Sequence, residues 1–446
     1  MNQRSVLLRT KVLVAVATAA FSTTGIAAST IVPSAAHPNS HTGEVVTDGK
    51  TIVAPVTALL QVTGQPRVSL GYPRAIWDLE DIRQYKQLLN TSLELKSALN
   101  ELQAWADKRI REPLDVPAHM LEADGTWSYR GFTRGTQDDK GNWTFKWDFN
   151  GALQNRTADV SNLGIVYALT GKRAYADYAR KLLLAMSDTF GYGKGSAKPD
   201  PNGLNHFEYY GFDGGDTGMF LSKACSGYDL IHDLSKFTAG ERVHIERDLI
   251  RPLAEHLSSA KYMYNGHDRW KMVCLYGIFI SGVTLDDQKL VDGALYGLGG
   301  SKANTTGGFM DCFNPKYLNA DRLWGADAKA EDGAASLTVM IAVAEVMWHR
   351  GVDLYGYQNM ALKNPFDAGL QLMLGADSKP VDPEYAKLIG TQSTGSYEYA
   401  YRRYRDDRYL TLIQKLKAKL VMAESQLPSL SDLPQTTVNE ASRSRV

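Results

Sequence analysis

The chain has 446 residues, and its 49 basic and 49 acidic residues balance, so the formal net charge is zero. A neutral chain has no overall field that would attract nucleic acid or an acidic membrane surface. Cys225, Cys274 and Cys312 lack the close spacing of zinc ligands and are too few for a disulfide framework. These features favour a globular protein that needs no metal or cofactor, and they leave one disulfide open.

The N-terminus has the pattern of a secretory signal peptide. Arg4, Arg9 and Lys11 precede the apolar stretch of residues 12–21, and small residues follow it. The apolar stretch is too short to be a stable membrane anchor. We therefore expect residues 1–28 to be removed and the protein to be exported, to the periplasm or the cell exterior, without membrane insertion.

The mature chain divides into one large domain and two tails. Residues 29–65 are rich in Ser, Thr, Pro and Val, and we expect a flexible lead-in there. Residues 66–425 carry the helical patterns described below, and we expect them to form one monomeric domain. We expect residues 426–446 to form a flexible C-terminal tail.

Helical periodicity begins at Asp78 and continues to residue 110. Thr91 and Glu94 have the spacing of a capping box, which divides this segment into two helices. Residues 160–170 and 175–187 form the next pair, separated by a short turn. Residues 217–233 then predict a further helix.

The second half of the chain continues in the same way. Thr238 and Glu241 make another capping box, ahead of a helix over residues 241–257. Apolar residues from Leu337 to Trp348 recur at helical spacing, and Gly351 is placed to cap that helix. A last helix is predicted over residues 358–373, whereas the alternating patterns of strands are scarce.

Repeated helix hairpins can pack as a bundle, as a solenoid or as a closed ring. No fixed sequence period is visible, which argues against a regular solenoid. Long segments rich in Gly, aromatic and charged residues separate the helices, over residues 121–155, 191–215 and 299–332. Three such loops opening near one end of a helical ring would form a groove.

A polar cluster stands directly ahead of an apolar helix in residues 264–282. Asn265, His267, Asp268, Arg269 and Trp270 form the cluster, and a buried helical face follows at Val273, Tyr276, Gly277 and Ile280. A His at such a helix mouth can donate or accept a proton near neutrality. Two interpretations are open: a catalytic His, or a cluster that caps the first turn.

Four separated segments resemble alginate lyases and heparinase-like lyases. They are residues 65–102, residues 155–183, the NGHDRW motif of residues 265–270, and residues 344–359. This resemblance implies an all-α fold, an incomplete (α/α) toroid of helix hairpins with a substrate groove. It also implies cleavage of a uronic-acid polysaccharide by β-elimination, with alginate or polymannuronate expected first and glucuronan next.

The motif departs from the family pattern at one position. The family places a neutralising Asn immediately before the His, whereas this chain has Gly266 there and Asn265 one step earlier. Other branches take that Asn from an earlier helix, which makes Asn155 the candidate. In related lyases a Tyr and an Arg follow one loop later, where this chain has Tyr317 and Arg322.

β-Elimination removes the proton on C5, next to the uronate carboxylate, and expels the 4-linked sugar. Asn155, Asn265 and His267 would bind the carboxylate and stabilise the enolate-like transition state. Tyr317 or Tyr210 would transfer protons, with the charge of Arg322 lowering the Tyr pKa and His206 in a loop that could face them.

Further residues are expected to bind the anionic polysaccharide. These substrate-binding candidates are aromatic, basic or amide side chains close to the catalytic ones in sequence: Asn265, Arg269, Trp270, Trp147, Arg156 and Lys316. The aromatic rings can stack on sugar faces, although such rings also serve as anchors of long loops.

Each catalytic candidate also has a structural interpretation. Asn155 could cap the helix that follows it, and His206 could be an exposed loop residue. Tyr317 could anchor its loop, and Arg322 could pair with a neighbouring Asp. Glu331 and Asp332 are expected to cap a helix that begins at Gly333.

Two other function classes stay open. An α/α-barrel glycoside hydrolase would need two carboxylates facing the scissile bond, with Asp213, Asp216, Glu331 and Asp332 as candidates. A non-catalytic protein would bind an anionic glycan without cleaving it. The reaction products separate these classes, because elimination leaves an absorbing C4–C5 double bond.

Overall fold

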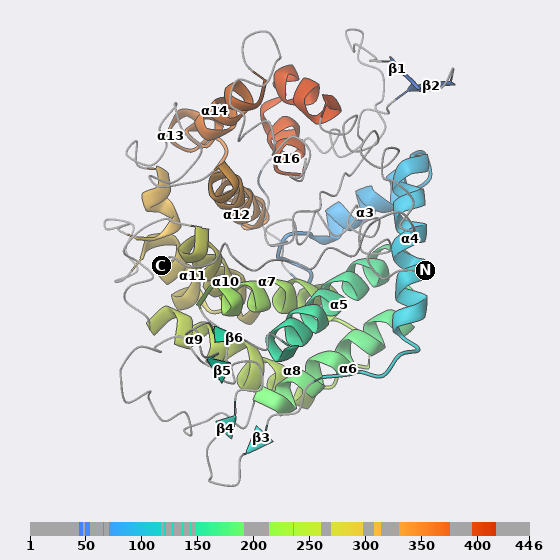
Figure 1. Ribbon diagram of the computed structural model, residues 1–446, viewed down its shortest axis with the longest axis vertical. Coiled ribbons are helices and arrows are strands. Elements are labelled where there is room, and N and C mark those ends of the chain that lie inside the picture. Colours follow the sequence, from blue (N-terminus) through green and yellow to red (C-terminus); the bar gives the residue numbers. More distant parts are fainter. Residues whose placement is uncertain are drawn as a thin grey trace.

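The computed structural model describes residue 66 and residues 71–116, 148–190, 214–234, 236–259, 269–297, 307–313, 330–374 and 395–415, together with several short strands. Helices dominate this part of the chain (Figure 1). None of the helices within it combines the length and the apolar character needed to cross a membrane.

The helices follow one another with few interruptions. Their bounds are α3 (Leu79–Leu88), α4 (Leu93–Arg109), α5 (Asp148–Thr170), α6 (Arg173–Phe190), α7 (Gly214–Ile231), α8 (Ala239–Ile245), the π-helix η4 (Glu246–Ile250), α9 (Arg251–Ser259), α10 (Arg269–Leu285), α11 (Gln288–Tyr296), the 3-10 helix η6 (Phe309–Phe313), α12 (Ala330–Trp348), α13 (Tyr357–Met360), α14 (Lys363–Leu374) and α16 (Gly395–Tyr404). Residues 407–415 form a further helix.

Six short strands occur in the described part, although the sequence shows little strand pattern. They pair as three antiparallel hairpins: β1 (Glu44–Thr47) with β2 (Lys50–Val53), β3 (Met120–Leu121) with β4 (Trp127–Ser128), and β5 (Thr136–Gln137) with β6 (Trp143–Thr144). The last four strands precede α5 in sequence and have two residues each.

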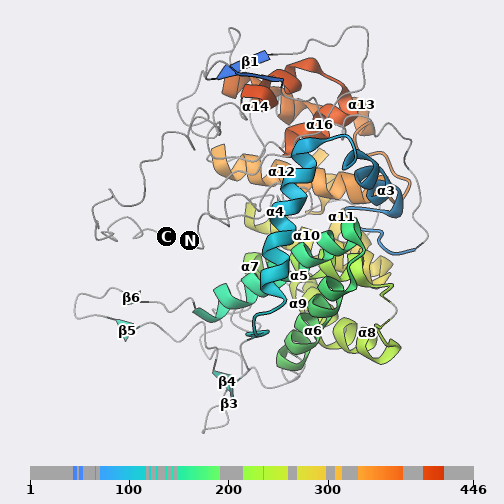
Figure 2. The same ribbon diagram turned by 90° about the vertical axis from the view of Figure 1, so that its right-hand side faces the viewer.

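From α5 onward the helices alternate between two layers. The inner helices α5, α7, α10, α12 and α16 contact one another in that order, and α6, α9, α11 and α14 pack beside them as the outer layer. Short connections join inner helices to the outer helices that follow, as at Gly171–Lys172 and Asp286–Asp287. The hairpins form an incomplete ring, the all-α (α/α) toroid that the sequence predicted (Figures 1 and 2).

The two ends of this ring differ. Because each outer helix returns the chain, the inner helices run in the same direction, and α5, α7, α10 and α12 all begin at one end, here called the entry end. Residues 71–78, here called the strap, cross the opposite end. The Tyr72 hydroxyl donates to the carbonyl of Thr284 at 2.7 Å, near the end of α10. The backbone N–H of Ala75 donates to Asp229 of α7 at 3.0 Å.

Glycines allow the inner helices to approach closely. A Cβ atom on Gly227 of α7 would lie 2.6 Å from a methyl group of Val160 in α5. On the other side of α7, a Cβ on Gly218 would lie 2.5 Å from the carbonyl oxygen of Val273 in α10. Both contacts are closer than real Cβ atoms tolerate, so α7 fits between its neighbours only because these positions lack side chains.

The helix boundaries follow their capping residues. The helical pattern was predicted to begin at Asp78, and this residue is the N-cap of α3, where its side chain accepts a bond from the N–H of Asp81 at 2.9 Å. The capping box of Thr238 and Glu241 at α8 is also confirmed. The box predicted at Thr91 is wrong by one residue, because Ser92 is the N-cap of α4 and accepts from the N–H of Leu95.

A second difference follows α12. Gly351 has a φ of 79°, which fits its predicted capping role. The last predicted helix begins only at Lys363, because Gln358, Asn359 and Met360 have φ values of 47°, 57° and 60°. These left-handed residues form the separate turn α13.

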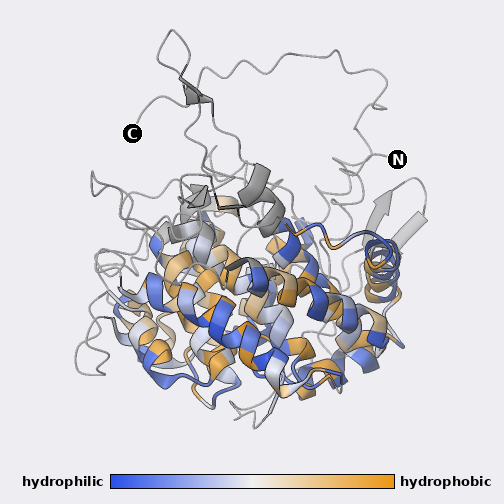
Figure 3. Ribbon diagram, turned by 90° about the horizontal axis from the view of Figure 1, so that it is seen from below, coloured by the Kyte–Doolittle hydropathy of each residue, from blue (hydrophilic) through white to orange (hydrophobic). Residues whose placement is uncertain are grey.

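The interior is apolar, as the periodicity predicted. Val273, Tyr276 and Ile280 of α10 are buried, and Cys225, Cys274 and Cys312 are buried and form no disulfide. The helices seen in Figure 3 carry both hydrophilic and hydrophobic residues along their length, as amphipathic helices of an outer layer do.

Candidate active site

Most of the predicted site residues lie outside the described part of the chain: His206, Tyr210, Trp147, Asn265, His267, Lys316, Tyr317 and Arg322. Their roles therefore stay predictions. Arg269 and Trp270 are the first two residues of α10, and Asn155 and Arg156 lie within α5. Among the hydrolase candidates, Asp213 lies outside the described residues and Asp216 belongs to α7.

The connectivity of the ring groups the candidates by end. His206 and Tyr210 precede α7 in sequence, and His267 precedes α10. Tyr317 and Arg322 precede α12. All of these helices begin at the entry end. In sequence, the predicted residues therefore precede helices that begin at the entry end.

Asn155 has an unusual environment for a residue of the inner layer. It is the only exposed side chain among the described side chains of α5, α7, α10, α12 and α16. Its position in the eighth place of α5 makes the capping interpretation wrong, because the helix already begins at Asp148. An exposed amide in an otherwise packed layer marks a place where solvent, or a ligand, reaches the inner helices.

The acidic pair ahead of α12 also differs from expectation. The helix begins at Ala330, three residues earlier than predicted, so Glu331 and Asp332 lie in its first turn and do not precede it. Carboxylates in a first turn interact favourably with the positive end of the helix dipole.

Arg156 lies in a cluster of charged residues beside Asn155. Its Nε is 3.4 Å from Oδ2 of Asp159, one turn further along α5. The same carboxylate oxygen accepts a 2.7 Å bond from Nε of Arg109, at the end of α4. The structure therefore gives Arg156 a carboxylate neighbour within the protein, and its predicted role in substrate binding is untested.

Arg109 fastens α4 to the hairpin of α5 and α6. Only 5% of its side chain is exposed, and it donates to the Tyr178 hydroxyl at 2.8 Å and to the Pro113 carbonyl at 2.9 Å. Burial raises the pKa of Asp159, although its bond from Arg109 and the charge of Arg156 act in the opposite direction. This clasp fixes the part of α5 that carries Asn155.

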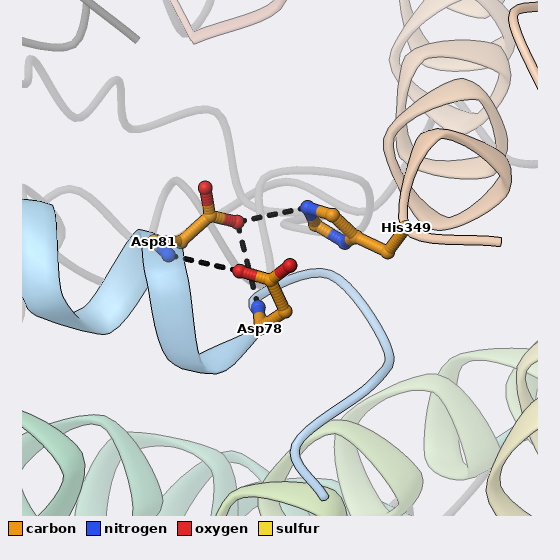
Figure 4. Close-up of side chains that lie close together, drawn as sticks. All are labelled: Asp78, Asp81 and His349. Carbon is orange, nitrogen blue, oxygen red and sulfur yellow. Dashed lines mark hydrogen bonds and ion pairs between the residues drawn. The ribbon is translucent and has the colours of Figure 1, made fainter. Parts of the chain in front are cut away.

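A cluster of acidic residues and a His lies at the strap end (Figure 4). Asp78, Asp81 and His349 are buried, and each offers one ligand atom within 4.8 Å of the others. Nε2 of His349 lies 2.9 Å from Oδ2 of Asp81. Nδ1 of the same ring lies 2.8 Å from the carbonyl oxygen of Ala75 in the strap.

These contacts define the protonation of His349. Nε2 lies beside the carboxylate of Asp81 and Nδ1 beside a backbone carbonyl, and this arrangement favours the doubly protonated ring. Burial acts to lower the pKa of His349, but the bond to Asp81, helped by the charges of Asp81 and Glu345, raises it above the usual value. A doubly protonated imidazole has no lone pair for a metal. The cluster is better explained as a buried ion pair than as a metal site.

The ion pair continues into a larger network. Arg402 of α16 lies 3.4 Å from Oδ1 of Asp81 and 3.7 Å from Oε2 of Glu345 in α12. Arg403 binds both oxygens of Glu345, at 3.0 and 2.8 Å, and its guanidinium stacks 3.8 Å from the centre of the Trp348 ring. The network connects α3, which precedes the ring in sequence, to the last inner helices α12 and α16.

Sequence reasoning missed this network. The sequence gives a partial indication of the network, because four Arg residues and several Tyr residues lie within residues 397–409. Spacing along one helix does not reveal a partner that is hundreds of residues away, as Asp81 is from Arg402.

Comparisons with known proteins agree on one class. No family model matches the chain. A curated alginate lyase from Stenotrophomonas maltophilia (strain K279a) is 28% identical over 273 residues, which cover 58% of this chain and 34% of that protein. The crystal structure of an alginate lyase from Bacteroides ovatus superposes with a TM-score of 0.56 at 14% identity, covering 77% of this chain and 96% of that chain.

The chain resembles alginate lyases. Alginate lyase A1-III from Sphingomonas species A1 is also similar, with a TM-score of 0.45 at 14% identity, over 76% of this chain and 91% of that chain. The likeness to the curated relative confirms the predicted resemblance to alginate lyases, and the Bacteroides ovatus structure confirms the toroid fold. The chain spans about a third of the length of the curated alginate lyase that it matches, 34%.

Proposed function

We propose that this protein is a polysaccharide lyase that cleaves a uronic-acid polysaccharide by β-elimination. Alginate or polymannuronate is the first expected substrate and glucuronan the next. Support comes from the likeness in sequence and fold to proteins named alginate lyases. We further propose that the protein is exported through its N-terminal signal and acts as a monomer on the anionic polysaccharide.

The observation that carries the proposal is the exposure of Asn155. No other described side chain of the inner helices is exposed, yet this amide is open to solvent in the early turns of α5. An amide N–H can donate to a uronate carboxylate and so stabilise the charge that develops when the C5 proton leaves. The clasp around Arg109 holds the helix that carries it.

The residues predicted for the entry end would carry out the remaining steps of the reaction. Asn265 and His267 would share the carboxylate with Asn155. Tyr317 or Tyr210 would take the C5 proton and return one to the leaving oxygen. Arg322 would favour the ionised Tyr, because a nearby positive charge lowers the pKa of a phenol.

The test is to follow two products of the same reaction. The purified protein is mixed with polymannuronate, polyguluronate and glucuronan, and ultraviolet absorbance and reducing ends are measured together. Elimination predicts that both rise, because each cut leaves a C4–C5 double bond. Reducing ends without absorbance would indicate a hydrolase, and binding without either signal would indicate a glycan-binding protein.

A further inference from the structure

Lys223 is the tenth residue of α7, an inner helix whose other described residues are all buried. Lys223 alone among them is half-buried. Lys is almost never fully buried, because taking its ammonium group out of water is costly unless an opposite charge compensates it. Such a side chain buries its stem along the helix and keeps its charged head within reach of solvent. The charge of Lys223 is therefore directed to an accessible space beside α7.

The contacts of α7 show which side Lys223 occupies. Gly227 faces α5 on one flank of the helix, and Gly218 faces α10 on the other. Tyr228 turns to the outer side, where its hydroxyl donates to Glu246 of η4 at 2.6 Å. At about 100° per residue, Tyr228 stands about 100° from Gly227 in one sense of rotation, and Lys223 stands about 40° from it in the other. Lys223 is therefore on the face of α7 that turns away from the outer side, toward the inside of the ring.

The helix itself supplies no counter-charge for Lys223. An ion pair within a helix joins residues three or four apart. The positions three and four residues from Lys223 hold Met219, Phe220, Ser226 and Gly227. A carboxylate that compensates this ammonium group comes from another segment of the chain or from a ligand.

The depth of Lys223 in the ring is close to that of Asn155. Gly227 of α7 is level with Val160 of α5, because the two residues are in contact. Lys223 is four residues before Gly227 and Asn155 is five before Val160, so both lie about 6–8 Å nearer the entry end at 1.5 Å per residue. Side chains lean toward the N-terminus of their helix, which for α7 is the entry end. Lys223 therefore extends toward the end at which we expect substrate to enter.

We propose that Lys223 binds a uronate carboxylate of the polysaccharide inside the ring. This inference rests on the proposed function and adds a cation to the amides predicted there. A Lys ammonium is a compact charge with three donors on a flexible stem, which suits the capture of a single acid group. Lys223 binds that group equally before and during the reaction and transfers no proton, so it acts on KM and not on kcat.

The experiment compares Lys223→Met, which keeps an apolar stem and removes the charge, with Lys181→Met, which removes an exposed Lys from the outer helix α6. KM, kcat and melting temperature are measured on the polyuronate that the wild type cleaves, at low and at moderate salt. For Lys223→Met we expect KM to rise about 10- to 100-fold, the scale of one hydrogen bond to a charged group, with little change in kcat. Lys181→Met should behave as the wild type does.

Two further measurements test the charge itself. Salt screens an ion pair, so added salt should raise KM less in Lys223→Met than in the wild type. Lys223→Arg keeps the charge, and its KM should lie closer to the wild-type value than that of Lys223→Met. If Lys223→Met does not fold, Lys223→Gln replaces it, because Gln keeps a polar head without the charge.

Other outcomes overturn the inference. A fall in kcat with unchanged KM would make Lys223 a proton-transfer residue, and a lower melting temperature with unchanged KM would assign it to an ion pair within the protein. Unchanged KM, kcat and melting temperature would show that no acid group binds there. A wild type that cleaves no polyuronate fails the proposed function itself, which the wild-type assay shows before any variant is made.

Discussion

At the scale of single residues, His349 is a buried side chain whose two ring nitrogens both face oxygen atoms. It is buried between the Ala75 carbonyl and the carboxylate of Asp81, and its pKa is raised there, chiefly by the bond to Asp81 against the effect of burial. Replacing one partner of a buried ion pair leaves the other charge without compensation.

His349→Gln should therefore lower the free energy of unfolding by about 3–5 kcal/mol, the range found for broken buried pairs. Chemical denaturation measures it. The control is His244→Gln, which removes a His paired with Asp188 and Asp248 near the surface and should cost about 0–1 kcal/mol. Equal losses in the two variants would contradict the assignment of His349 to a buried network.

Asp229 and His349 together predict how stability depends on pH. Burial raises the pKa of Asp229 to about 7, although the N–H groups of Ala75 and Arg74 and the charges of Arg74 and His349 lower it. The pKa of His349 is raised above 6.5. A group whose pKa is raised by folding stabilises the folded state most at pH values below its pKa in the unfolded chain. This stabilisation is lost as the pH rises through the pKa of the group in the folded state.

Stability should therefore fall between pH 5 and pH 8. Denaturation midpoints at the two pH values measure the slope. In Asp229→Asn the slope should be smaller, because this position no longer titrates, even though the variant is less stable throughout. A wild type that grows more stable over this range would refute the prediction.

Side chains that act locally could be predicted from the sequence, and those with distant partners could not. Thr238 was recognised as a cap because its partner Glu241 is three residues away. Asp229 and His349 meet the strap across more than 150 residues, and no periodic pattern reports such a contact.

At the scale of elements, glycine decides how closely the inner helices pack. Gly227 faces Val160 with no room for a Cβ atom, whereas Gly240 of α8 has no atom within 4 Å of that position. The same substitution should therefore have opposite effects at the two sites.

Gly227→Ala should lower the free energy of unfolding by about 1–3 kcal/mol or more, because the backbones of α5 and α7 must separate. Gly240→Ala should raise it by about 0.5–1 kcal/mol, because Ala is the better helix former. Thermal unfolding of both variants provides the comparison. Destabilisation of similar size at both positions would show that the close approach does not matter.

Helix existence was easier to predict than helix limits. The apolar faces of α7, α10 and α12 were found from their spacing, since each buries a continuous stripe. The start of α14 was missed because Gln358, Asn359 and Met360 adopt a left-handed turn that non-glycine residues rarely form. The early start of α5 was missed because its first two turns lie in a segment read as a loop.

At the scale of the whole molecule, the two ends of the ring differ in structure. The strap and the network around Asp81 close one end with buried charges and hydrogen bonds. At the other end the inner helices begin, and the exposed Asn155 lies in the early turns of α5. The fold could be predicted from the helix hairpins and the resemblance, whereas this division needed long-range contacts.

We expect the entry end to carry catalysis and the strap end to contribute stability. The most direct test is turnover per folded protein for His267→Ala and for His232→Ala, on the polyuronate that the wild type cleaves. His232 stacks on Tyr72 of the strap, with ring centroids 3.4 Å apart. For His267→Ala we expect turnover to fall by about 100-fold or more, which is the scale of losing a positioned acid–base group. For His232→Ala we expect near-normal turnover. Full turnover in His267→Ala, with or without a loss in His232→Ala, would contradict this account.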